Sequence, residues 1–149
     1  MKFYFFLLVV IMSFGIISCG NTRQGRQSVS ENIPTLLKGD FRDDYGIRFT
    51  INDSLWVQHP NVKYHIISWD TTAQFLLAKN DVNNPSEPGL FTRIDYMTLP
   101  NMEPFGWGFC LTSYKAKTIE EAKLDASADR QNPKKGCNGY PFSRMERVY

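Results

Sequence analysis

Between residues 47 and 148 the chain alternates apolar and polar residues in short runs that turn-forming residues separate. This period of two is typical of antiparallel strands and not of helices. Such runs lie at 47–51, 55–57, 64–69, 74–78, 90–97, 106–114 and 142–148. The connection at 80–89 is rich in asparagine and proline and lies outside the strands. The sequence therefore predicts a mainly β domain.

One helix is predicted late in the chain. Thr118 precedes Glu121 by three residues, which is the capping-box pattern. An alanine-rich segment follows to about Asp129, and Asn132 and Pro133 then stop the helix.

About seven short strands and one helix cannot bury both faces of an open sheet. We therefore predict a small antiparallel β-barrel or half-barrel, with the helix packed on its wall or end. The run 106–114 is predicted as a central strand, with Trp107 on one face and two small residues, Gly108 and Cys110, on the other. Small residues suit a position where another backbone approaches closely.

The first residues are typical of a secretory signal, with Lys2 followed by an apolar run that is too short to span a membrane. The segment 16–19 resembles a bacterial lipobox, which implies cleavage before Cys19 and a lipid on its sulfur. We expect a signal peptide at 1–18, a polar tether at 19–38 and one β-rich domain at 39–149. Gly20 is not an aspartate, and by resemblance to enterobacterial sorting the anchor implies the outer membrane of the cell envelope.

The overall charge argues against a nucleic-acid partner. The chain has 17 Lys and Arg against 15 Asp and Glu, and the cations are scattered among acids. The partners expected are the membrane, through the lipid, and a small ligand or an envelope protein.

Cys110 and Cys137 form an even pair once Cys19 is lipidated, and the exported location favours a disulfide between them. Such a bridge would stabilise the fold by roughly 3–4 kcal/mol in the chain-entropy model. A redox or metal pair is the disfavoured alternative, since there is no Cys-x-x-Cys and neither His59 nor His65 is near in sequence. No metal or cofactor is expected.

Four stretches look like an uncharacterised family of bacterial exported and lipoprotein domains: 78–81, 92–96, 106–110 and 136–145. The resemblance covers most of the chain after Gly46. It implies no activity, and it strengthens the domain and disulfide predictions. The strand pattern is also lipocalin-like, although the lipocalin Gly-x-Trp signature is absent near Trp56.

Arg93 and Asp95 are two residues apart on a predicted strand and therefore point to the same side. If that side faces the barrel interior, they form a buried pair that needs further hydrogen bonds, for which Arg144 or Tyr114 is available. The arginine would then suit the carboxylate or phosphate of an anionic ligand. The alternative, a polar plug or a surface pair, is favoured.

Large aromatic residues either line an apolar ligand cavity or fill the core. A small barrel leaves little interior room, so core filling is favoured. The residues concerned are Trp56, Tyr64, Trp69, Phe75, Phe91, Trp107 and Phe109.

The connection at 80–84 offers Asn80, Asp81, Asn83 and Asn84 as oxygen donors. Calcium loops gather more carboxylates, so a structured turn is favoured. The two histidines form no triad or zinc pattern, and no serine stands in a nucleophile elbow.

The leading hypothesis is a non-enzymatic lipoprotein that binds a small apolar or anionic ligand, with Arg93, Asp95, Arg144 and Trp107 as candidate contacts. The alternative is an envelope interaction module, with aromatic patches near 104–107 or 140–142. A hydrolase is the least supported class.

Overall fold

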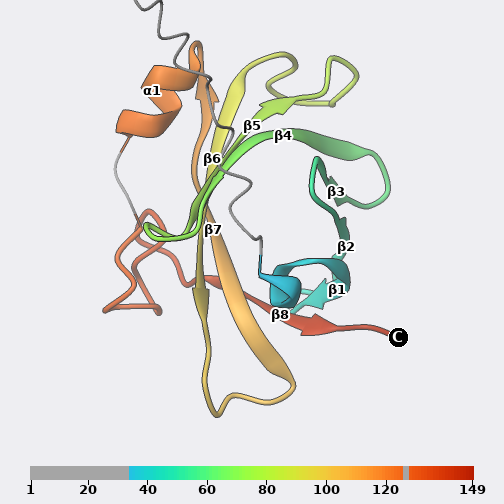
Figure 1. The fold of residues 1–149 in the computed structure, drawn as a ribbon, viewed down its shortest axis with the longest axis vertical. Coiled ribbons are helices and arrows are strands. Elements are labelled where there is room, and N and C mark those ends of the chain that lie inside the picture. The colour runs from blue at the N-terminus through green and yellow to red at the C-terminus, as the bar shows by residue number, and fades with distance from the viewer. Residues whose placement is uncertain (1–33, 126–127) are drawn as a thin grey trace, which may run out of the picture.

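The computed structural model describes residues 34–125 and 128–149 (Figure 1). The expected signal peptide, Cys19 and most of the expected tether therefore lie outside the described residues. The end of the 19–38 segment forms a short 3-10 turn, η1 (Thr35–Leu37), and Leu37 is buried in the main core. The chain thus packs against the domain slightly before Gly39.

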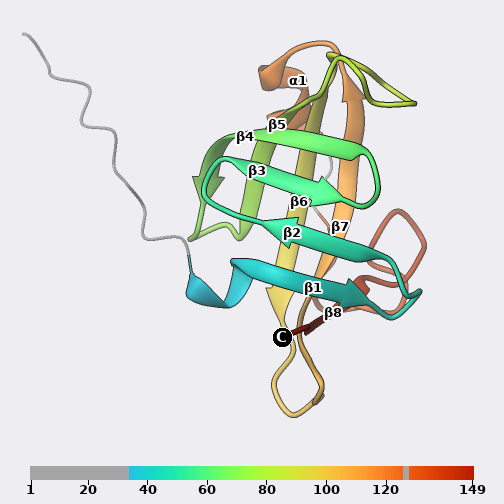
Figure 2. The ribbon, with the colours of Figure 1, turned by 90° about the vertical axis from the view of Figure 1, so that its right-hand side faces the viewer.

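Within the described residues, eight antiparallel strands form a closed barrel in chain order, and the last strand pairs with the first (Figure 2). This confirms the predicted mainly β barrel with one late helix. The strands are β1 (Gly39–Asp43), β2 (Arg48–Ile51), β3 (Leu55–Gln58), β4 (Val62–Asp70), β5 (Phe75–Asn80), β6 (Phe91–Thr98), β7 (Phe105–Ala116) and β8 (Ser143–Arg147).

β1 is the strand that the sequence pattern does not predict, because Phe41 is its only apolar residue. Its place comes from pairing with two neighbours, β2 and β8. Phe41 packs in the main core. Because side chains alternate along a strand, Asp43 faces the same side. The pairing of β1 therefore brings a carboxylate to the inner face of the barrel.

Aromatic side chains fill the middle of the barrel. The Trp107 ring on β7 packs edge-to-face against Phe41 and Trp56, with centroids 5.2 and 5.9 Å apart. The Phe109 ring lies 5.1 Å from Trp56 and 5.4 Å from Phe49. These edge-to-face contacts suit the quadrupoles of the rings. Core filling is thus the role of the aromatic residues in this part of the barrel.

A second layer covers the outer face of β5, β6 and β7. It consists of α1 (Ile119–Leu124) and the connection 128–142, which lie on the same side of β6 and β7 (Figure 1). Cys110 on β7 and Cys137 in this connection form a disulfide, with Cα atoms 5.4 Å apart, as the sequence predicts. Gly108 is small for the predicted reason, because a Cβ there would lie 3.1 Å from the carbonyl oxygen of Ser143.

Helix α1 begins at the predicted capping box. The Thr118 hydroxyl accepts a hydrogen bond from the backbone N–H of Glu121 at 3.1 Å. The Glu121 carboxylate reaches back to the N–H of Lys117 at 2.7 Å, one residue beyond the usual partner. Local sequence therefore sets where the helix starts.

The helix ends at Leu124, not near Asp129 as predicted. Arg93 on β6 donates a hydrogen bond to the carbonyl oxygen of Lys123 in the last turn, at 2.8 Å. This tertiary contact pairs a carbonyl that would accept a backbone N–H if the helix were longer. The alanine content of the segment does not indicate this contact. Among the described residues, no helix has the length and apolar character that crossing a membrane requires.

Candidate functional site

Arg93 and Asp95 lie on the same side of β6, as predicted, but that side faces away from the barrel interior. Ile94 and Tyr96 take the inward positions and pack in the main core. α1 and the 128–142 connection cover the outer side, so Asp95 is 0% exposed. The pair is therefore buried between the barrel wall and the second layer.

Asp95 has a full set of hydrogen-bond donors. Arg93 binds it with two nitrogens, Nε to Oδ2 at 2.9 Å and Nη2 to Oδ1 at 3.0 Å. Arg130 Nη2 donates to Oδ1 at 2.9 Å, and the Thr112 hydroxyl donates to Oδ2. The additional donors are thus Arg130 and Thr112, not Arg144 or Tyr114 as predicted.

Arg130 also ties the connection 128–142 to the barrel. Its Nε donates to the carbonyl of Tyr96 at 2.9 Å, and its Nη2 donates to the carbonyls of Ala73 and Gln74 at 3.0 and 2.7 Å. Arg93 is packed as well, with its guanidinium carbon 4.1 Å from the centre of the Phe75 ring. The network therefore fastens the second layer to β5, β6 and β7.

An open depression of about 660 Å³ lies beside this network. Arg93, Arg130, Lys123 and Asp125 contribute to its lining. Positive charge therefore reaches solvent here. The bonds of the two arginines to Asp95 and to backbone carbonyls leave them little freedom to reorganise around an anion.

Arg144 and Trp107 lie elsewhere. Arg144 on β8 donates from Nε to Asp44 Oδ2 at 2.8 Å, and its guanidinium carbon lies 4.7 Å from the Phe105 ring centre. It borders a groove of about 560 Å³ whose lining includes Leu99, Met102 and Phe142. Trp107 is enclosed in the core, and its Nε1 has no hydrogen-bond partner among the described residues. The four candidates do not form one site.

A different pocket lies at one end of the barrel and is lined by residues of the β1–β2 turn, the end of β3 and the 128–142 connection. These segments lie on the right of Figure 2. We call it the barrel mouth. Its volume is about 460 Å³, and its floor is the aromatic core at Phe49 and Phe109. Ile47 and Leu111 add apolar surface beside them. The mouth is thus a concave site of the size and position at which barrels bind small molecules.

Three polar side chains from different strands line the mouth: Asp43 on β1, Gln58 on β3 and Ser143 on β8. Each shares the inward face of its strand with a core residue two positions away, respectively Phe41, Trp56 and Met145. Gln58 and Ser143 use their side chains in no hydrogen bond to another described residue. Their hydrogen-bonding capacity is therefore available inside the pocket.

Asp43 is 5% exposed and forms no ion pair within residues 34–125 and 128–149. Its Oδ1 accepts from the backbone N–H groups of Tyr45 at 3.0 Å and Ile47 at 2.8 Å. Burial raises the pKa of this carboxyl, although those N–H groups act in the opposite direction, and the neighbouring Asp44 adds to the rise. Asp43 is therefore a buried carboxyl with no cationic side chain paired to it among the described residues.

Three exposed tyrosines also line the mouth. Tyr45 comes from the β1–β2 turn, Tyr114 from β7 and Tyr140 from the 128–142 connection. The disulfide at Cys137 and a backbone bridge between Cys137 and Tyr140 hold the last of these against β7. Aromatic rings therefore meet at the pocket from three separate parts of the fold.

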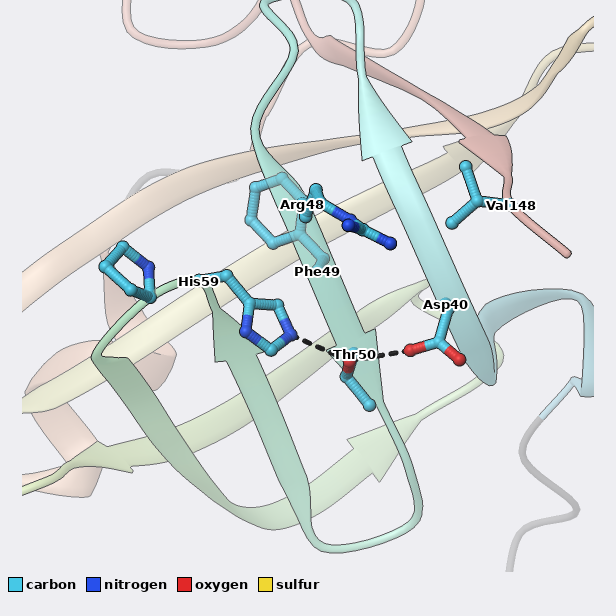
Figure 3. Close-up of a pocket in the computed structure, with 7 residues that line it drawn as sticks. Asp40, Arg48, Phe49, Thr50, His59 and Val148 are labelled. Carbon is cyan, nitrogen blue, oxygen red and sulfur yellow. Dashed lines mark hydrogen bonds between the residues drawn. The ribbon is translucent and has the colours of Figure 1, made fainter.

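An acid on β1, a hydroxyl on β2 and an imidazole just after β3 lie close together on the outer side of the barrel (Figure 3). Thr50 Oγ1 donates to Asp40 Oδ1 at 2.7 Å and lies 2.9 Å from His59 Nε2. With the hydroxyl proton directed to Asp40, the imidazole nitrogen must donate to the hydroxyl oxygen. In a nucleophilic triad the imidazole lies between the other two and accepts the hydroxyl proton. This arrangement therefore does not activate Thr50.

The 80–84 connection is a structured turn. Asn80 donates to the carbonyls of Glu87 and Tyr114, and its side-chain oxygen accepts from Thr92. Asn84 pairs with both backbone groups of Lys63 at 2.8 Å. In the described part of the chain, no three His, Cys, Asp or Glu side chains gather as metal ligands would.

Sequence reasoning did not identify the mouth. Gln58 lies just beyond a predicted strand, and Asp43 lies on the strand that was not predicted. One signal was present in the sequence, since Asp43 is two residues after Phe41 and so continues the alternation of a strand.

The chain matches no protein-family model, no curated protein and no solved structure.

Proposed function

We propose that the chain is a lipid-anchored protein of the bacterial cell envelope, held at the outer membrane through Cys19, whose barrel is a non-enzymatic binding domain for a small ligand. The signal and lipobox pattern at 1–19 supports the anchor. The observation that supports a binding role is the composition of the barrel mouth. Polar side chains there have free hydrogen-bonding capacity and lie beside an apolar floor.

Such a composition is what small-molecule sites have in common. Their walls are largely apolar, and a few convergent polar groups orient the ligand. Phe49 and Phe109 would contact the apolar part of the ligand, while Gln58 and Ser143 would bond its polar part. The volume of about 460 Å³ falls within the usual range for ligand sites.

Native mass spectrometry of the mature protein, taken from its own membrane in mild detergent, tests this proposal. We expect a native mass that exceeds the denatured mass by that of a carried ligand. Ser143→Phe would fill the mouth and should abolish the excess. Ser68→Phe, on an exposed position of β4 outside the mouth, is the matched control and should retain it. A native mass without any excess would count against a carried ligand.

The groove beside Arg144 favours a second candidate, an envelope interaction module. Met102 and Pro141 are exposed in its lining, and Tyr45 belongs to both the groove and the barrel mouth. Part of it coincides with the aromatic patch expected at 140–142. Site-specific crosslinking from position 102 in intact membranes would test it, and no captured protein above background would count against it.

A further inference from the structure

We infer that the barrel mouth recognises an organic cation, an ammonium or guanidinium group on an apolar body, with the Asp43 carboxylate as its counter-charge. This inference rests on the proposed function, because it assumes that the mouth is a ligand site. It names the class of ligand that the mouth takes.

The charge of the lining favours a cationic ligand. Asp43 is the one formally charged residue among those that line the mouth, and no lysine or arginine belongs to that lining. A buried carboxylate without a partner is costly, since desolvation is not offset by attraction. A cation in the mouth would supply the missing partner, and an anion would be repelled.

Asp43 also caps the β1–β2 turn. Its Oδ1 accepts two of the backbone N–H groups of the β1–β2 turn, those of Tyr45 and Ile47. Oδ2 has no side-chain donor among the described residues. Capping the turn therefore uses one oxygen and leaves the other for a ligand. Asp44, the adjacent acid, differs because its oxygens bind the side chain and backbone of Arg144.

The aromatic lining of the mouth also suits a cation. Tyrosine rings attract cations through the negative potential of their faces. Tyr45 and Tyr140 are 66% and 73% exposed, so their rings have room for a ligand. Tyr114 already has the Nζ of Lys115 at 6.0 Å from its ring centre, and Lys115 does not belong to the lining of the mouth. The apolar floor accounts for the apolar body of the ligand.

Three probes with one apolar body and different charge would test the inference on the full mature protein in detergent: phenethylammonium, 2-phenylethanol and 3-phenylpropionate. Calorimetry at neutral pH should show the ammonium binding about tenfold more tightly than the alcohol, the order of a partly desolvated charge contact. The propionate should bind more weakly than the alcohol.

Asp43→Asn keeps an acceptor oxygen for the turn and removes the charge. It should lower ammonium affinity to that of the alcohol and leave the alcohol unchanged. Asp44→Asn is the matched control, because Asp44 lies outside the mouth, and it should retain the preference. If Asp43→Asn fails to fold, Gln58→Lys serves instead. It offers Asp43 an internal cation, so it should abolish ammonium binding and raise Tm.

The outcomes separate this inference from the proposed function. Equal binding of the ammonium and the alcohol to the wild type, or a preference that survives in Asp43→Asn, would overturn the cation inference and leave a ligand site standing. Absence of binding by every probe, together with a native mass that shows no ligand, would overturn both.

Discussion

Two buried carboxylates, Asp43 and Asp95, have opposite surroundings in this fold. Asp95, on the outer wall of the barrel, receives bonds from two arginines and a threonine, which come from three segments of the chain. Asp43, at the barrel mouth, receives two bonds from backbone groups of its own turn and has no counter-ion among the described residues. Both side chains are almost completely removed from solvent.

The difference shows that burial of a charge does not by itself identify a binding site. A buried ion with all its partners acts within the structure, because removing any one partner leaves the others uncompensated. A buried ion that lacks a counter-charge can gain one from outside. The pair that the sequence offers as a ligand clamp, Arg93 and Asp95, belongs to the first kind, and Asp43 belongs to the second.

The largest expected effect comes from breaking the completed network. Asp95→Asn leaves Arg93 and Arg130 without their counter-charge and should lower the free energy of unfolding by about 3–5 kcal/mol. Chemical denaturation measures it. Asp43→Asn, the same change at the other carboxylate, should change stability by less than about 1 kcal/mol, because the cap is preserved. Equal decreases in the free energy of unfolding of the two variants would contradict the conclusion that Asp95 and Asp43 differ in their structural role.

The disulfide should affect both regions, because it holds the connection that carries Arg130 and Tyr140. Replacing Cys110 and Cys137 together by alanine should cost about 3.5 kcal/mol in the chain-entropy model for a separation of 27 residues. Denaturation of the wild type in reductant should give the same loss. An unchanged midpoint in reductant would show that the connection is held by its other contacts.

The two arginine–aspartate pairs, Arg130 with Asp95 and Arg144 with Asp44, differ in burial and should differ in their contribution to stability. Arg130→Gln should lower stability by about 1.5–3 kcal/mol, since it removes a charged donor from the buried Asp95. Arg144→Gln should cost less than about 1 kcal/mol, because the Arg144 side chain is 42% exposed and its pair with Asp44 is screened by solvent. Thermal melts of the two variants in parallel would measure the difference, and a reversed order would contradict it.

The smallest expected effect is a pH dependence that differs in sign between two acids. The pKa of Asp43 is raised above 3.8, so its ionised form opposes folding, and stability should increase as pH falls through the raised pKa toward 3.8. The N–H of Asn83 and the imidazole of His65 lower the pKa of Asp81 to about 2. The contribution of Asp81 is therefore lost as pH falls from about 4 to about 2.

Unfolding curves between pH 2 and 7 for Asp43→Asn and Asp81→Asn would separate the two contributions. In wild type the free energy of unfolding should increase at mildly acidic pH, and in Asp43→Asn this increase should be absent. In Asp81→Asn the decrease in the free energy of unfolding at lower pH should be absent. Parallel curves for wild type and Asp43→Asn would mean that the mouth does not perturb this carboxyl.

Local patterns predict much of the fold. A period of two locates every strand except β1, and the capping box locates the start of α1. The pattern fails where a segment owes its structure to distant partners. β1 has one apolar residue and forms through β2 and β8, and α1 ends where Arg93 takes a helix carbonyl.

The sequence therefore predicts the mainly β class, the start of the helix and the pairing of Cys110 with Cys137, because these follow from neighbouring residues or from simple counting. The tertiary structure alone decided which carboxylate has a counter-charge. Arg130 reaches Asp95 across 35 residues of sequence only because the barrel closes and the 128–142 connection lies against its wall. The same closure turns Asp43 inward at an end of the barrel, and no lysine or arginine is among the residues that line the pocket there.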